Sequence, residues 1–119
     1  MTSKAFDEAL EQTREIEITT IGRTTGGPVT FPVWFVRQGD SILLLPLRGS
    51  DTGWYRNLLE DPTIQVLAGP DEHPATATLV TDAPGVEEVV EAFRKRYGAE
   101  DIEAYYPKTD VAVQVPLTG

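Results

Sequence analysis

The fold is decided by residues 15–57, which read EIEITTIGRTTGGPVTFPVWFVRQGDSILLLPLRGSDTGWYRN. Polar and apolar residues alternate over Glu15–Ile21, as is typical of a strand with one side facing solvent. A glycine-bearing connection leads to a second expected strand at 29–37, and a short turn leads to a third at 41–47. Because the third segment is apolar at nearly every position, we expect it to be covered on both faces. This stretch therefore predicts a meander of three antiparallel strands.

Regular patterns continue on both sides of this meander. Apolar residues at helical spacing predict helices at 4–14, from Gly53 to a stop at Pro62, and at 84–97, with a weaker helical turn at 100–105. Further strands are expected at 64–68, 75–80 and 111–115. Closing the sheet would hide the edges that an apolar run such as 42–45 cannot safely expose. The chain is therefore predicted to be mainly β (α+β), a six-stranded antiparallel split β-barrel with peripheral helices.

Length and composition favour an ordinary cytoplasmic protein. The 119 residues, 40% of them hydrophobic and 24% charged, predict a single domain spanning 1–119. No apolar run approaches the roughly 20 residues of a membrane helix, and the N-terminus lacks a signal-peptide pattern. The net charge of −9 disfavours binding to nucleic acid or anionic membranes.

The residue types also limit the chemistry. With no cysteine and one histidine, His73, the chain is not expected to form disulfides, use a thiolate or build a histidine metal site. His73 lies between Glu72 and Pro74, so we expect it in an exposed loop without a functional role.

Short motifs follow one another in a defined order. They are Gly22-Arg23-x-Thr25-Gly26, the segment 32–36 before a Gly-Asp turn, Arg48-Gly49, and Trp54-Tyr55-x-Asn57-Leu58 before Asp61-Pro62. In this order they resemble the deazaflavin-dependent nitroreductase family, within the split-barrel flavin and deazaflavin oxidoreductases. The resemblance runs from about Thr19 to Val66 and more loosely to the last strand. It implies a split barrel, reduced F420 as hydride donor, and electron-poor acceptors such as quinones, enones or nitroaromatics.

The resemblance also implies a cofactor site. Arg23 and Arg48 would contact the phosphate or acidic tail of the cofactor, and backbone N–H groups of 25–27 and 48–50 would form an anion nest. Side chains at the expected helix start would shape the ring pocket. The expected cofactor-binding residues are Arg23, Thr25, Gly26, Arg48, Gly49, Ser50, Trp54, Tyr55, Asn57 and Tyr97. Hydride transfer needs no protein nucleophile or metal, so no catalytic residue and no metal ligand is assigned.

The chain departs from the family pattern at several positions. Thr24 and Val29 stand where the family usually has basic residues, and Leu47 replaces a small polar residue. Glu100 and Glu103 lie in a segment that is usually tyrosine-rich, where they would repel a polyglutamyl tail. Two alternatives therefore stay open: FMN as the cofactor, or a non-enzymatic ligand-binding barrel that has lost cofactor contacts.

One tripeptide points to a different class of protein. Asp51-Thr52-Gly53 matches the catalytic tripeptide of aspartic proteases, but Trp54-Tyr55 follows where small residues would be needed. The expected partners are a small-molecule substrate and a second copy of the chain in a homodimer, with neither nucleic acid nor membrane insertion.

Overall fold

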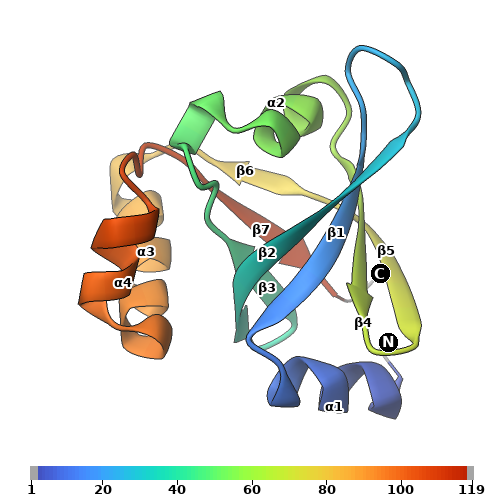
Figure 1. Cartoon of the computed structure of the whole chain (residues 1–119), viewed down its shortest axis with the longest axis horizontal. Coiled ribbons are helices and arrows are strands. Elements are labelled where there is room, and N and C mark those ends of the chain that lie inside the picture. Colours follow the sequence, from blue (N-terminus) through green and yellow to red (C-terminus); the bar gives the residue numbers. More distant parts are fainter. Residues whose placement is uncertain (1–2, 118–119) are drawn as a thin grey trace.

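The structure, a computed structural model, describes residues 3–117. Seven strands form one curled antiparallel sheet in the order β5-β4-β1-β2-β3-β7-β6 (Figure 1). The strands are β1 (Glu15–Ile21), β2 (Pro28–Gln38), β3 (Ser41–Leu44), β4 (Thr63–Ala68), β5 (Asp71–Thr76), β6 (Thr78–Val80) and β7 (Ala112–Pro116). The helices are α1 (Lys4–Gln12), the short 3-10 helix η1 (Gly49–Asp51), α2 (Gly53–Glu60), α3 (Ala83–Tyr97) and α4 (Ala99–Tyr105).

The predicted meander and the α+β split-barrel class are confirmed, but the sheet has seven strands instead of six. The expected strand at 75–80 is interrupted at Ala77, whose N–H donates to the carbonyl of Pro62 at 2.8 Å. Before this break β5 pairs with β4 at one edge of the sheet, and after it β6 pairs with β7 at the opposite edge. The third strand was also predicted too long, because it ends at Leu44 and the chain then turns toward η1.

Two apolar cores lie on the two faces of the curled sheet. The inner core includes residues of α1 and α2, and the outer core includes residues of α3 and α4. In β3, Ile42 and Leu44 join the inner core, while Leu43 and the following Leu45 join the outer core. This alternation explains the unbroken apolar run, because both faces of β3 are covered. The helices α1 and α2 lie at opposite ends of the curl, and α3 and α4 lie on its flank (Figure 1).

The strand β2 changes its neighbour halfway along its length. It pairs with β1 from Pro28 to Trp34 and with β3 only from Phe35 onward. Within residues 3–117, the β3-facing edge of its first half therefore has no strand partner. The side chain of Tyr97 lies at the change of partner. Its hydroxyl accepts from the Phe35 N–H (3.1 Å) and shares its proton between the carbonyls of Phe35 (2.7 Å) and Arg14 (2.8 Å).

The placement of His73 was predicted wrongly. It lies in β5, not in a loop, and is partly buried. Its ring packs against Phe6 of α1 with 5.6 Å between centroids. Burial lowers the pKa of His73, because removal from water disfavours the charged imidazolium.

Two further findings concern residues 3–117 only. None of the helices there has the length and apolar character needed to cross a membrane. No group of three or more histidine or acidic side chains in this part is arranged to hold a metal ion.

Candidate functional site

A groove of about 560 Å³ opens along the unpaired edge of β2. One wall is β2 from Phe31 to Trp34, and the other is formed by the chain after β3 and the start of α2. The end of α4 closes it with Tyr105 and Tyr106. The groove therefore exists because β3 stops at Leu44 and leaves the first half of β2 uncovered.

Aromatic rings dominate one end of this groove. Trp34 stacks on Tyr97 with 4.4 Å between centroids and 13° between planes, and forms a T-shaped pair with Tyr105 with 5.5 Å between centroids. At the mouth, Tyr105 and Leu47 are 56% and 49% exposed, which is unusual for large apolar side chains. Burial raises the pKa of Tyr106, because removal from water disfavours the charged phenolate. Such a surface suits a flat, uncharged ring system.

A smaller pocket of about 240 Å³ adjoins the groove at the start of α2. Phe31 and Gly53 line both cavities, so the two meet at this helix end. The rest of the small pocket is formed by the loop between β1 and β2, by Val29 of β2 and by Asn57 of α2. Ligand groups in the two cavities could therefore belong to one molecule.

Arg23 and Asn57 bind that loop to α2. The guanidinium of Arg23 donates to the Asn57 side-chain oxygen at 2.7 Å and to the Gly53 carbonyl at 3.1 Å. The Asn57 oxygen also accepts from the Arg23 backbone N–H at 3.3 Å, and the Asn57 amide donates to the hydroxyl of Thr20 at 3.1 Å. Asn57 is buried and fixes the two walls of the small pocket relative to each other.

The N-terminus of α2 faces the junction of the two cavities. Within the described chain, the N–H groups of Gly53, Trp54 and Tyr55 have no bonded acceptor. The Thr52 hydroxyl, which could have capped them, accepts instead from the Arg48 N–H at 2.7 Å. The positive end of the helix is therefore available to an anionic ligand group.

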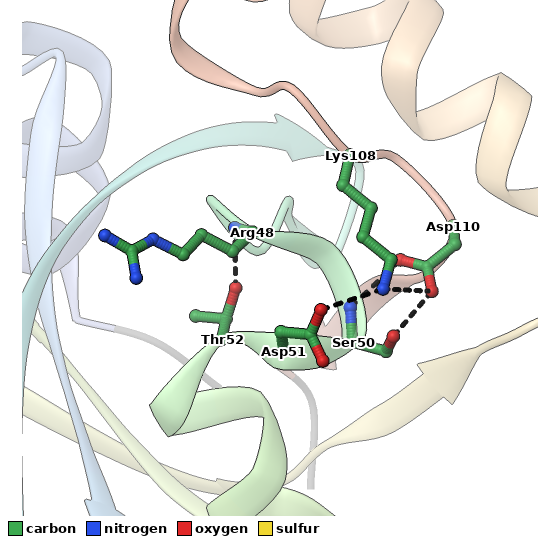
Figure 2. A network of polar contacts seen from close by, with 6 residues as sticks. All are labelled: Arg48, Ser50, Asp51, Thr52, Lys108 and Asp110. Atoms are coloured by element: carbon green, nitrogen blue, oxygen red, sulfur yellow. Dashed lines mark hydrogen bonds and ion pairs between the residues drawn. The ribbon is translucent and has the colours of Figure 1, made fainter.

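The N–H groups of 48–50, where an anion nest was expected, are bonded within the protein (Figure 2). The Gly49 N–H donates to the Pro46 carbonyl at 3.1 Å. The carboxylate of Asp110 accepts from the Ser50 N–H at 2.9 Å and from the Ser50 hydroxyl at 2.6 Å. An internal carboxylate thus occupies the position expected for a ligand.

Lys108 completes this network at η1. Its ammonium group lies 2.9 Å from Asp51 and 3.8 Å from Asp110. The Asp51 of the protease-like tripeptide is thus an exposed ion-pair partner, and Thr52-Gly53 leads directly into α2. Figure 2 shows the Arg48 side chain pointing away from the carboxylates. Arg48 is an exposed residue.

The expected nest at 25–27 is also partly used by the loop itself. The Gly26 N–H donates to the Gly22 carbonyl at 2.7 Å, and the Gly27 N–H lies 3.3 Å from the Thr25 hydroxyl. Thr25 still lines the small pocket, whereas Gly26 does not.

The remaining expected site residues divide between the groove and the core. Trp54 lines the groove, but Tyr55 belongs to the inner core, and Tyr97 stacks on Trp34 without lining the groove. Among the groove residues that were not expected from the sequence, four are aromatic: Phe31, Trp34, Tyr105 and Tyr106. The signal for the last two was present, because they form the only adjacent pair of tyrosines in the sequence.

Comparison with known proteins places the chain in a family. A family model described as F420H(2)-dependent quinone reductase matches residues 4–117. An F420H(2)-dependent quinone reductase of Mycobacterium tuberculosis is 34% identical over 61 residues, covering 49% of this chain and 41% of that protein. The match thus spans less than half the length of that relative.

Two solved structures share the fold. An F420-H2 dependent reductase, FDR-A, has a TM-score of 0.67 at 20% identity, covering 86% of this chain and 93% of its own. A structure described as a domain-swapped dimer has a TM-score of 0.68 at 20% identity, covering 86% and 79%. Because the family match extends over residues 4–117, the chain belongs to the F420H(2)-dependent quinone reductase family, a family of oxidoreductases.

Proposed function

We propose that this protein uses reduced F420 to reduce quinone-like, electron-poor small molecules. The observation that carries the proposal is the aromatic groove that meets the free N-terminus of α2 at Gly53. F420 joins a flat deazaflavin ring to a phosphate and an acidic tail, so it needs an apolar slot beside an anion-binding end. The groove and the helix start supply these two environments side by side.

The residues at the anion end fit a phosphate. Arg23 lies in the β1–β2 loop, which contacts α2, and Arg48 lies between β3 and η1. Among residues 3–117, neither forms an ion pair with a carboxylate. Arg23 is held in place by Asn57, whereas Arg48 is exposed and can turn toward a ligand. A phosphate here would be held by the α2 N–H groups and Arg48, not by a nest at η1.

The protein's contribution to the reaction is binding, orientation and exclusion of water. When bound, reduced F420 would supply a hydride, and a quinone that also takes up one proton from water would leave as the hydroquinone. Trp34, Trp54 and Tyr106 would hold two flat rings face to face, and Leu47 and Tyr105 would cover them at the mouth. The titratable side chains that line the groove are Glu15, Tyr105 and Tyr106, and we assign none of them a catalytic role.

Binding measurements test the cofactor assignment. F420, FMN and buffer alone are titrated into the parent protein and into Arg48→Ala. Lys95→Ala on α3 is the control, because it also removes one positive charge. Charge-assisted contacts contribute about 1.5–3 kcal/mol, so Arg48→Ala should weaken F420 binding roughly ten- to a hundredfold. Arg23→Ala should weaken it as well, but it also disturbs Asn57.

The outcomes separate the alternatives. Binding of FMN with no affinity for F420 would establish the flavin alternative, and binding of neither would favour a barrel that has lost its cofactor. If Arg48→Ala binds F420 as tightly as Lys95→Ala does, the anion end is placed wrongly. Turnover is then followed by the appearance of oxidised F420 with menadione as acceptor.

We also propose that the protein forms a homodimer. Leu59 on α2 is 57% exposed, and together with the apolar groove mouth it offers surface that a second copy could cover. Sedimentation at micromolar concentration tests this, and a monomer would contradict it.

A further inference from the structure

The basic residues divide into paired and unpaired groups. The chain has ten lysines and arginines and a net charge of −9. Four of them form ion pairs with carboxylates: Lys4, Arg37, Arg94 and Lys108. Among residues 3–117, the other six have no carboxylate within ion-pair distance, and two of these converge on one ring. In so acidic a chain, two cations that contact the same ring and have no counter-ion indicate a place for an anion.

The converging pair is Arg14 and Arg96. Their guanidinium carbons lie 5.3 and 5.2 Å from the ring centre of Tyr97. Arg96 is fixed further by its bond to the Thr13 carbonyl at 2.6 Å and by the Phe35 ring at 4.5 Å. The contacts with aromatic rings and this backbone oxygen partly offset the repulsion between the two cations. Both side chains remain exposed, so their remaining N–H groups can reach a ligand.

The pair lies beside the aromatic end of the main groove. The guanidinium carbon of Arg14 also lies 6.0 Å from the ring centre of Trp34, which lines the groove. The residue after Arg14, Glu15, lines the groove as well. Trp34 is three residues along β2 from Phe31, where the groove meets the α2 end. At about 3.3 Å per residue, the two ends are roughly 10 Å apart along the strand. Cations therefore lie near both ends of the groove: Arg14 beside Trp34, and Arg23 in the small pocket at the α2 end.

We propose that Arg14 and Arg96 form a subsite for the carboxylate or sulfonate of an anionic aromatic acceptor. The acceptor ring lies against Trp34, and its anionic group lies against the two guanidinium groups. That this ligand is reduced as an acceptor rests on the proposed function, whereas the binding of an aromatic anion at this place does not. The tail of F420 is a poor occupant, because it extends from the phosphate, which we assign to the α2 end.

The second arginine has a physical reason. Glu15 lines the same end of the groove, and its carboxylate repels an incoming anion. One guanidinium would only balance this charge, whereas two leave a net attraction. The subsite therefore selects anionic over neutral rings only while both arginines are present.

A binding experiment without F420 tests the subsite. The probes are a naphthoquinone sulfonate and the same naphthoquinone without the sulfonate, and the signal is quenching of tryptophan fluorescence. Trp34 and Trp54 are the two tryptophans of the chain, and both line the groove. The parent should bind the sulfonate at least about tenfold more tightly than the neutral quinone, as expected for a charge-assisted contact. Added salt should reduce this preference.

Variants assign the preference to the two arginines. Arg14→Ala and Arg96→Ala should each lose most of it while binding the neutral quinone as before. Lys95→Ala, next to Arg96 on α3, should keep it. Arg14→Lys and Arg96→Lys retain the charge and should keep part of the preference. They therefore separate loss of the charge from a general loss of folding.

Two results would overturn the subsite: no preference for the sulfonate in the parent, or a preference that survives in both alanine variants. Failure of the proposed function looks different. A protein that does not oxidise reduced F420 but still prefers the sulfonate through Arg14 and Arg96 would contradict only the proposed activity.

Discussion

Replacing Asn57 by alanine should destabilise the protein far more than a surface substitution on the same helix. Asn57 is 4% exposed and joins three parts of the molecule: β1 through Thr20, the β1–β2 loop through Arg23, and α2 itself. Alanine removes both its amide donor and its oxygen acceptor. The hydroxyl of Thr20, which is fully buried, then loses this partner.

The magnitude follows from these bonds. A neutral hydrogen bond such as that to Thr20 contributes about 0.5–1.5 kcal/mol, and a buried group left without a partner costs about 1–3 kcal/mol. The bond to Arg23 is charge-assisted, but Arg23 is exposed, so we count it at the low end. The expected loss is about 2–4 kcal/mol of unfolding free energy, a large share of the roughly 5–15 kcal/mol of a typical domain.

Urea unfolding followed by tryptophan fluorescence measures this loss. Arg56→Ala, at an exposed position of α2, is the matched control and should change stability by less than about 0.5 kcal/mol. Asn57→Asp keeps an acceptor for Arg23 and should lose less than Asn57→Ala. If Asn57→Ala is as stable as Arg56→Ala, Asn57 does not hold the loop to the helix, and the description of the small pocket fails.

Three other predictions concern the supports of the site. Gly49→Ala should cost about 1–3 kcal/mol in thermal unfolding, because Gly49 has φ +56° and a new methyl group would meet Asp110; Gly26→Ala, with φ +75° but open space, should cost less. Desolvation raises the pKa of Asp110, but the hydrogen bonds from Ser50 outweigh it, so the pKa is lowered. Its stabilisation should therefore be complete above the ordinary aspartate pKa of about 4 and be lost as the pH falls through the lowered value, and Asp110→Asn should remove this part of the acid sensitivity in unfolding curves between neutral and acidic pH. Tyr97→Phe should cost about 1–3 kcal/mol and accelerate amide exchange at Phe35, and unchanged exchange would contradict the role of the hydroxyl.

The meander was predictable because its signals are local. Alternation in Glu15–Ile21 and the apolar run from Ser41 determine the faces of the strands without reference to the rest of the chain. The break at Ala77 was not predictable from such a pattern. It is a change of partner strand, from β4 before Ala77 to β7 after it, and the alternation of residues continues through it.

The candidate site was predictable in part for the same reason. Arg23, Thr25 and Trp54 line cavities and lie within motifs that sequence order alone identifies. The filling of the expected nest by Asp110 was not visible, because Ser50 and Asp110 are 60 residues apart in the chain. A glycine turn next to a basic residue indicates N–H groups that could bind an anion, but not which anion occupies them.

The hydroxyl of Tyr97 has a consequence for how the chain folds. The β1–β2 hairpin can form early, since its strands are neighbours in sequence, but its last rung at Arg14 and Phe35 is completed by a side chain 62 residues beyond Phe35. Closing so long a loop costs more conformational entropy than closing the hairpin turn. The rung at the aromatic end should therefore form after the rest of the hairpin. In pulse-labelling during refolding, the amide of Phe35 should become protected later than those of Phe31 and Val33, together with the docking of α3.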